Sequence, residues 1–280
     1  MSNYEYKAQV VDAKSYDYIR KMVYEHSRIN LGDDKLDLVS ARLNKRLRET
    51  KILTIPDYIE YLNANEGEME NLIDIISTNH TFFFREIQHF EFMQTHALPE
   101  LHDYAKNQGE NEFRLWCAAS SSGDEPYSLA IQLQEYFKNK NFNWDIQATD
   151  ISNRILAKAQ NAVFPEERLK EVRPDLLRAY FQKGFGAQEG FFRVKEELRK
   201  KVTFSRLNLL QPQYPFQKPF HVIFCRNVMI YFDRQTQEEL VNHLSTLLVP
   251  GGYLMIGHSE SLTGIKHPLK SVKPAIYHKI

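Results

Sequence analysis

A loop of small residues and two acids follows the first strand-like segment and has the composition of a ligand-binding turn. Residues 118–124 read Ala-Ala-Ser-Ser-Ser-Gly-Asp, and Glu125-Pro126 begin a helical pattern that reaches residue 137. Small side chains let the backbone pass close beneath a ligand. The loop is not G-x-G-x-x-G, and its acids stand where a diphosphate would need positive charge. It therefore favours a ligand with hydroxyls and a positive charge, although Asp124 and Glu125 could equally complement only the helix dipole.

A further acid, Asp150, ends the second strand-like segment, residues 144–150. At the end of such a strand an acid can accept hydrogen bonds from both hydroxyls of a ribose. The alternative is that Asp150 caps the helix that starts at Ser152. S-adenosylmethionine has a ribose diol and a cationic tail, so it fits both the loop and Asp150. A nicotinamide dinucleotide would fit Asp150, but the glycine-poor loop disfavours it.

The elements that must position these acids alternate along the second part of the chain, residues 91–280. Helical patterns cover 125–137, 152–161 and 233–248, between strand-like runs at 113–119, 144–150, 202–208, 221–227 and 253–258. This rhythm predicts an α/β fold, a parallel sheet with helices on both faces, which binds ligands at the carboxyl ends of its strands. Residues 162–200 interrupt the rhythm with prolines, glycines and the strand-like FFRVK. We expect them to form an inserted subdomain with a small antiparallel ribbon.

Residues 1–90 lack strand-like alternation and predict a separate, all-helical N-terminal domain. Apolar residues recur at helical spacing from Tyr16 to Val23 and from Leu36 to Leu47. Pro56, behind Thr54, suits the first turn of a further helix.

The bulk composition excludes several classes of protein. Lys+Arg and Asp+Glu are both 36 in 280 residues, which does not suggest a nucleic-acid binder. No stretch is long and apolar enough to span a membrane, and no signal-peptide pattern is present. The two cysteines, Cys117 and Cys225, lie in apolar runs and fit a reducing cytoplasm. The histidines show no metal-ligand spacing, so we expect no metal.

Six ordered sequence blocks carry a family resemblance. The blocks are residues 78–86 (TNHTFFFRE), 116–128 (WCAASSSGDEPYS), 148–151 (ATDI), 208–210 (NLL), 224–233 (FCRNVMIYFD) and 257–260 (GHSE). From about residue 15 to its end the chain resembles the CheR family of chemotaxis receptor methyltransferases. Asp124 stands where that family usually has Glu, a small departure.

The resemblance implies an architecture and a cofactor. It implies a helical N-terminal domain joined to a Rossmann-like class I methyltransferase domain with an inserted β-subdomain, binding S-adenosylmethionine and releasing S-adenosylhomocysteine. By matching position, its cofactor contacts fall on Asn79, Thr81, Arg85, Glu125, Asp150, Asn208, Leu209, Arg226 and Asn227.

The implied reaction is methyl transfer to glutamate side chains of chemotaxis receptors. A glutamate carboxylate, with a pKa of about 4.3, is already an anion at neutral pH and needs no general base. By resemblance, Arg85 and Tyr231 are the catalytic residues that hold the reacting groups. Rival interpretations are a methyltransferase of the same fold with another substrate and a non-catalytic S-adenosylmethionine-binding signalling module.

Two segments predict contacts with partners. Arg42, Lys45 and Arg46 fall on one helical face of a basic run, which favours electrostatic docking of a glutamate-rich receptor helix over a merely solvated face. Residues 183–190 look like the Gly-x-Gly loop of family members that tether to a receptor's C-terminal tail peptide. We expect a monomer.

Overall fold

The computed structural model describes residues 8–77 and 81–280, and the chain divides into two compact units. The first comprises Met1–Thr78 with Tyr231–Asp233, and the second comprises Asn79–Ile230 with Arg234–Ile280. The sequence-based boundary at residue 90 therefore differs from the structural one. Phe90 and Met93 pack in the same buried cluster as the sheet residues, which is why their segment belongs to the second unit.

The first unit is helical throughout its described part, as expected. Its elements are α1 (Ala13–Ser27), η1 (Asp33–Lys35), α2 (Leu36–Thr50), α3 (Ile55–Ala64) and α4 (Glu68–Ile76). The Asp12 side chain caps α1 by accepting from Ser15 N, and Thr54 caps α3 in the same way. Apolar residues at helical spacing, such as Leu43 and Leu47, are fully buried and form the core of this unit.

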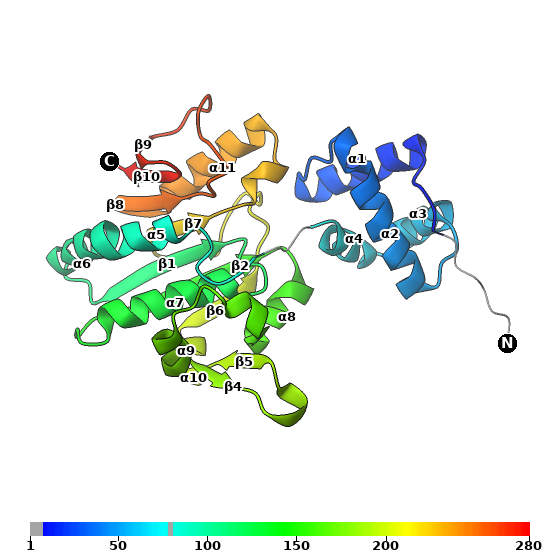
Figure 1. Cartoon of the computed structure of the whole chain (residues 1–280). Helices are drawn as coiled ribbons and strands as arrows, with labels where there is room; N and C mark the ends of the chain where they lie inside the picture. Colours follow the sequence, from blue (N-terminus) through cyan, green and yellow to red (C-terminus); the bar gives the residue numbers. More distant parts are fainter. Residues whose placement is uncertain (1–7, 78–80) are drawn as a thin grey trace. The chain divides into compact units, whose positions relative to one another are not determined.

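The second unit is built on a seven-stranded sheet with the order β6-β2-β1-β7-β8-β10-β9 (Figure 1). The strands are β1 (Glu112–Ala118), β2 (Asn143–Asp150), β6 (Val202–Arg206), β7 (Phe220–Cys225), β8 (Leu248–Met255), β9 (Leu269–Lys273) and β10 (Ile276–Lys279). The first five are parallel, and the β9–β10 hairpin adds two antiparallel strands. The α/β fold class is confirmed, but the terminal hairpin was not expected.

Every residue of the central strand β7 is buried, so both faces of the sheet are covered. The helices of this unit are α5 (Ile87–Phe92), a π-helical turn η2 (Met93–Ala97), α6 (Leu98–Asn107), α7 (Asp124–Phe137), α8 (Asn153–Asn161) and α11 (Arg234–Thr246). The short η5 (Met229–Tyr231) follows β7 in the chain. No helix in the described ranges is long and apolar enough to cross a membrane.

The predicted insertion is present and holds a three-stranded antiparallel sheet with the order β3-β5-β4. Its elements are β3 (Val163–Pro165), η3 (Glu166–Leu169), α9 (Pro174–Tyr180), β4 (Phe181–Lys183), η4 (Gly186–Gln188), β5 (Phe191–Val194) and α10 (Glu196–Arg199). This small sheet lies in the lower part of Figure 1, and its edge strands β3 and β4 each have one unpaired side.

The parallel register brings the carboxyl ends of β1, β2, β6, β7 and β8 to one edge of the large sheet. Most of the predicted cofactor residues follow these strand ends directly. This edge is therefore the place to look for the site.

Candidate cofactor site

A buried guanidinium, Arg226, organises the carboxyl edge of the sheet. It directly follows β7, and its side chain is 1% exposed. Nη1 lies 2.5 Å from Glu125 Oε2, and Nη2 lies 2.9 Å from Glu86 Oε2 and donates to the Arg85 carbonyl at 2.7 Å. Burial alone would lower the pKa of Arg226, but the two carboxylates outweigh it and raise that pKa. The guanidinium is therefore a permanent positive charge between two acids.

Glu125 lies in the first turn of α7 and links Arg226 to the first strand. Its Oε1 accepts a hydrogen bond from Cys117 Sγ at 3.2 Å. Burial, together with the nearby Glu125 carboxylate, raises the pKa of the Cys117 thiol well above its usual value. Cys117 and Cys225 are both free and buried, as expected of small apolar side chains.

Asp150, at the end of β2, joins the first two strand ends. Its Oδ2 accepts from Ser121 N at 2.9 Å, and its Oδ1 accepts from Ser152 N at 3.1 Å. The N-cap of α8 is Ser152, whose own hydroxyl accepts from Ile155 N. Asp150 therefore is not the helix cap that the alternative interpretation required, and its carboxylate faces the small-residue loop.

Asp124, the other acid of that loop, has an internal partner. It is fully buried, and Arg168 Nη1 lies 3.1 Å from its Oδ2 and donates to Ser122 Oγ at 2.7 Å. Burial raises the pKa of Asp124, while the bonds from Ser122 and Arg168 oppose that rise. Of the two acids at the start of α7, only Glu125 takes part in the Arg226 network. Arg168 comes from η3, so the insertion braces the loop.

Asn227 and Asn208 also lie at this edge. Asn227 Nδ2 donates to Glu86 Oε1 at 3.4 Å, and its backbone N–H is bonded to Glu260. The Asn208 side-chain oxygen accepts from Leu210 N at 3.0 Å, while Leu209 is buried. Both asparagines thus follow strands that end at the carboxyl edge of the sheet, where Arg226 lies (the Arg226 edge).

The structure describes two more of the predicted residues, Thr81 and Tyr231. Thr81 is partly buried ahead of α5. Tyr231 belongs to the first compact unit, where its carbonyl accepts from Asn30 N at 2.8 Å. Asn79 lies outside the described residues. The roles of these residues stay predictions.

The backbone around the edge is unusual, since several residues other than glycine have positive φ. They are Phe84 (56°), Glu86 (58°), Ala119 (60°), Ser121 (48°) and Asn227 (57°). The left-handed conformation disfavours residues with a Cβ, and it gathers at functional sites.

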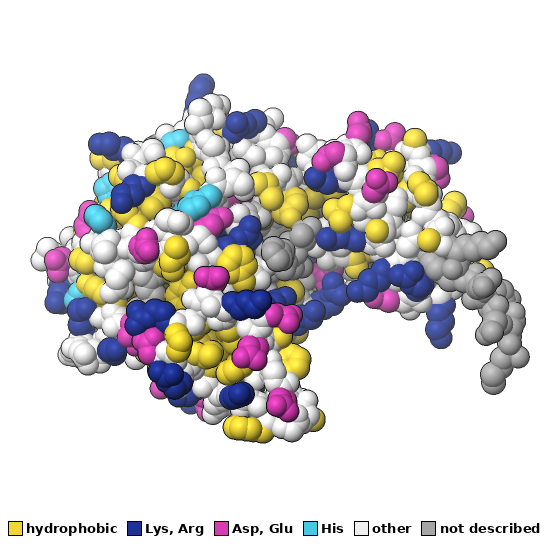
Figure 2. Space-filling model, viewed as in Figure 1, with side chains coloured by type: hydrophobic (Ala, Val, Ile, Leu, Met, Phe, Trp, Pro, Cys, Tyr) yellow, Lys and Arg dark blue, Asp and Glu magenta, His cyan; other side chains and the backbone are white. Residues whose placement is uncertain are grey.

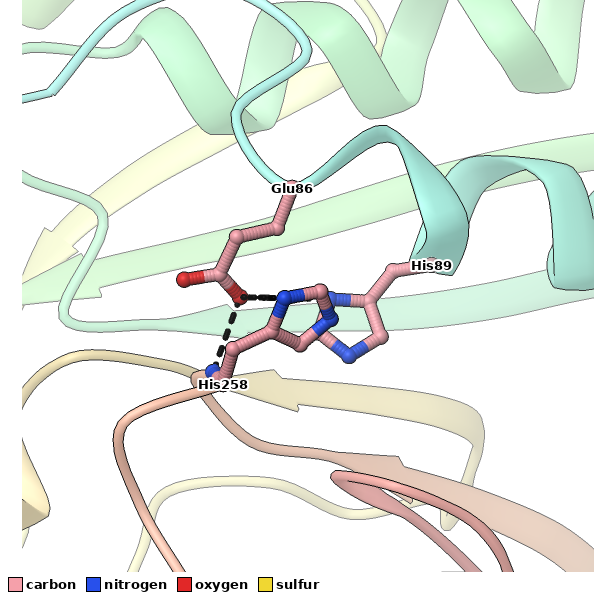
Figure 3. A group of neighbouring side chains, drawn as sticks. All are labelled: Glu86, His89 and His258. Carbon is pink, nitrogen blue, oxygen red and sulfur yellow. Dashed lines mark hydrogen bonds and ion pairs between the residues drawn. The ribbon is translucent and has the colours of Figure 1, made fainter.

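One group of potential metal ligands occurs among the described residues: Glu86, His89 and His258, with ligand atoms within 4.8 Å of one another. Figure 3 shows the three side chains converging from the turn before α5, from α5 and from the loop after β8. However, Glu86 Oε2, which faces both rings, already accepts from Arg226 and from His258 N at 3.0 Å. A cation there would displace these donors beside a buried guanidinium, so we assign no metal to the group. The sequence-based expectation of no metal stays a prediction.

Sequence reasoning assigned no role to Glu86 or Glu260, although both end blocks that carry the resemblance. Each is a carboxylate that binds a neighbouring segment: Glu86 holds Arg226, and Glu260 holds the backbone after β7. The only signal was an acid at the end of each block, and sequence position alone does not separate such an acid from a solvated one.

Comparisons with known proteins give one answer. Residues 14–77 match the family model described as CheR methyltransferase, all-alpha domain, and residues 79–277 match CheR methyltransferase, SAM binding domain. The chain is 41% identical over 263 residues to the chemotaxis protein methyltransferase of Borreliella burgdorferi, covering 92% of each chain. It is 40% identical over 250 residues to that of Escherichia coli, covering 89% of this chain and 84% of the relative.

Fold, site and comparisons define an S-adenosylmethionine-dependent methyltransferase. The chain belongs to the CheR methyltransferase family, whose two domain models match it in order.

Proposed function

We propose that this protein transfers the methyl group of S-adenosylmethionine to glutamate side chains of chemotaxis receptors and forms glutamyl methyl esters. The observation that supports this most directly is the Arg226 edge, where residues matching the family's cofactor contacts converge. The similar proteins of Borreliella burgdorferi and Escherichia coli carry the name chemotaxis protein methyltransferase. Receptor glutamates are the substrate that this name suggests.

The cofactor supplies an electrophilic methyl group, and the residues at the edge suit its polar parts. Asp150 offers a carboxylate to the ribose hydroxyls, and Glu125 offers a negative charge to the cationic tail. Asn208 pairs with the adenine edge through its amide. The remaining contacts come from Asn79, Thr81, Arg85, Leu209, Arg226 and Asn227.

Catalysis then needs positioning rather than proton transfer. The glutamate substrate is an anion, so Arg85 holds one carboxylate oxygen through its planar fork and leaves the other free to attack. The Tyr231 hydroxyl orients the reacting groups. Alignment of this kind, with water excluded, contributes on the order of 7–11 kcal/mol to lowering a barrier.

The proposal is tested with a radiolabelled methyl donor and a receptor signalling fragment, followed by alkali treatment. Glutamyl methyl esters release volatile methanol, which is the expected result. Label that resists alkali would indicate N-methylation and another substrate class. No incorporation, with donor binding intact, would indicate a non-catalytic binding module.

Of the three basic residues predicted to dock the receptor helix, Arg42, Lys45 and Arg46, two have partners within the first unit. Arg42 Nη1 donates to the last carbonyls of α4, at 2.6 Å for Ile75 O, and Arg46 is paired with Glu68. Lys45 is exposed. We therefore assign capture of the acidic substrate to Lys45 and its exposed neighbours, and expect it to weaken with rising salt.

The three-stranded sheet is the proposed site for a receptor tail peptide. Figure 2 shows hydrophobic side chains at the surface over this sheet, and Phe185 is 83% exposed, with Val163 and Phe191 each 41% exposed. An extended peptide would add to an open strand edge beside them. Calorimetric titration with receptor tail peptides tests this, and the absence of heat would remove the tether.

The protein would act as a monomer in the cytoplasm, without nucleic acid.

A further inference from the structure

Glu260 is a buried carboxylate whose partners are four backbone N–H groups. It lies in the loop after β8 and is 9% exposed. Its Oε2 accepts from Gly257 N at 2.6 Å and from Asn227 N at 2.9 Å. Its Oε1 accepts from Met229 N at 2.8 Å and from Ile230 N at 3.3 Å.

Such an arrangement is unusual for a buried acid, which is ordinarily paired with a cation. No ion pair to Glu260 occurs within the described ranges. Burial raises the pKa of Glu260, while the four amides oppose that rise. Charge-assisted hydrogen bonds to backbone N–H groups are among the stronger ones in proteins. The carboxylate therefore holds backbone in place rather than neutralising a side chain.

The backbone that it holds is the turn immediately after β7. Without Glu260, the N–H groups of Asn227, Met229 and Ile230 would lose the acceptor that satisfies them. Asn227 also has a φ of 57°, so the chain leaves β7 in a strained direction that needs outside support. The turn keeps its shape because Glu260, from the loop after the neighbouring strand β8, accepts from its N–H groups.

Gly257 lies where the loop after β8 meets the turn after β7. A Cβ built at this position would lie 2.9 Å from Glu260 Oε2 and closer still to the Asn227 side-chain amide. A side chain at position 257 would displace the Glu260 carboxylate or the Asn227 amide, and glycine leaves room for both. The strands β7 and β8 are parallel neighbours, so their two loops form one unit at the carboxyl edge.

We infer that Glu260 is a positioning residue for the cofactor site: it sets the turn after β7 that carries Arg226 and Asn227. The inference rests on the proposed function, in which these two residues contact the cofactor. Glu260 acts through the turn and touches neither substrate.

The test is Glu260→Gln, which keeps the shape but replaces one acceptor oxygen with an NH₂ donor that faces two N–H groups. We expect at least a tenfold weaker binding of S-adenosylhomocysteine by calorimetry and a matching rise in KM for the methyl donor. KM for the receptor fragment stays unchanged. Hydrogen exchange at the amides of residues 227, 229 and 230 accelerates in parallel.

Thr54→Ala is the matched control for lost stability. It removes the N-cap of α3 in the first unit, which typically destabilises a protein by about 1 kcal/mol. Product affinity should not change in this variant. If Glu260→Gln does not fold, Gly257→Ala carries the test, because it displaces the same carboxylate and should also weaken product binding.

The outcomes separate the inference from the proposed function. Wild-type protein that binds no S-adenosylhomocysteine would overturn the function. If the wild type binds it and folded Glu260→Gln binds it equally well, Glu260 has no positioning role and the function stands.

Discussion

Arg46 in the helical unit and Arg226 in the sheet unit both pair with carboxylates away from solvent, and the two are bonded differently. In the helical unit, Arg46 gives two nitrogens to one carboxylate: Nε lies 2.8 Å from Glu68 Oε1, and Nη2 lies 2.6 Å from Glu68 Oε2. Its third nitrogen, Nη1, lies 3.3 Å from Oε2 of the exposed Glu49. Tyr58 and Asn71 donate to the same carboxylate. This network is closed, since both oxygens of Glu68 have two donors.

In the sheet unit, Arg226 is divided between two carboxylates from distant segments. Glu86 precedes α5, and Glu125 begins α7. Each acid gives Arg226 one oxygen and directs the other to a weaker partner, Asn227 Nδ2 at 3.4 Å or Cys117 Sγ at 3.2 Å. Glu68, with two donors on each oxygen, stabilises the helical unit. Glu86 and Glu125 each have one weakly bound oxygen, and a ligand could replace the weak partner there.

The largest effects are expected when each of the two arginines is replaced, which tests whether Arg226, unlike Arg46, serves the cofactor site. Arg46→Leu leaves the buried Glu68 without its cation, and Arg226→Leu does the same to the largely buried Glu86 and Glu125, so each should lower the free energy of unfolding by about 3 kcal/mol or more. Only Arg226→Leu should also reduce product binding, at least a hundredfold per folded molecule. Denaturant titration and calorimetry measure the two effects. Equal binding in the two variants would show that the division of Arg226 has no role in the site.

Truncating the Arg85 side chain tests its role in methyl transfer while the backbone contact with Arg226 is kept. The Arg85 carbonyl is a partner of Arg226, and that contact survives truncation of the side chain. Arg85→Ala should therefore stay folded and lower methyl transfer at least tenfold. Steady-state assays with the receptor fragment, alongside a circular dichroism spectrum, check this. Turnover at the wild-type rate would remove Arg85 from the mechanism.

Buried histidine makes the sheet unit sensitive to acid. Burial, with Arg226 close by, lowers the pKa of His89 from 6.5 to about 3, so the folded protein keeps this ring neutral. The unfolded chain takes up a proton below pH 6.5, so stability falls as the pH drops from 6.5 toward 3. At pH 5.5 this amounts to ~1.4 kcal/mol.

The measurement is urea unfolding at pH 7.5 and pH 5.5. His89→Gln should lose less stability between these pH values than the wild type, by about that amount. His26→Gln, at an exposed position on α1, serves as the control and should change nothing. An identical pH dependence in all three proteins would rule out His89 as the source.

Metal removal should have the smallest effect. Because the Glu86 oxygen that faces His89 and His258 already has two donors, chelator treatment should leave product affinity and turnover unchanged. Zinc titration of the chelated protein should show no stoichiometric binding at this group. Loss of activity on chelation, restored by one equivalent of zinc, would reverse that assignment.

The fold was largely predictable because its signals are local. Of the predicted strand 221–227, residues 221–225 fall on β7, and the Thr54-Pro56 start signal falls at the start of α3. The β9–β10 hairpin escaped prediction because Leu269–Lys273 has four exposed residues out of five and no continuous apolar run. An edge strand of this kind depends on its neighbour for stability.

The site was predictable only as far as position in the sheet determines it. Asp150 and Arg226 follow strand ends, and this places them at one edge. That Asp124 pairs with Arg168 of the insertion, while Glu125 pairs with Arg226, depends on contacts across 44 and 101 residues. Nothing in the spacing of adjacent acids distinguishes these partners.

The left-handed residues around the edge have a consequence for engineering. Each residue with a Cβ in this conformation destabilises the fold by roughly 1–2 kcal/mol. Glycine at Ala119 or Ser121 would relieve that strain and make the protein more resistant to heat. The same change would let the turn sample other shapes, so a thermostable descendant obtained this way should hold its methyl donor less firmly.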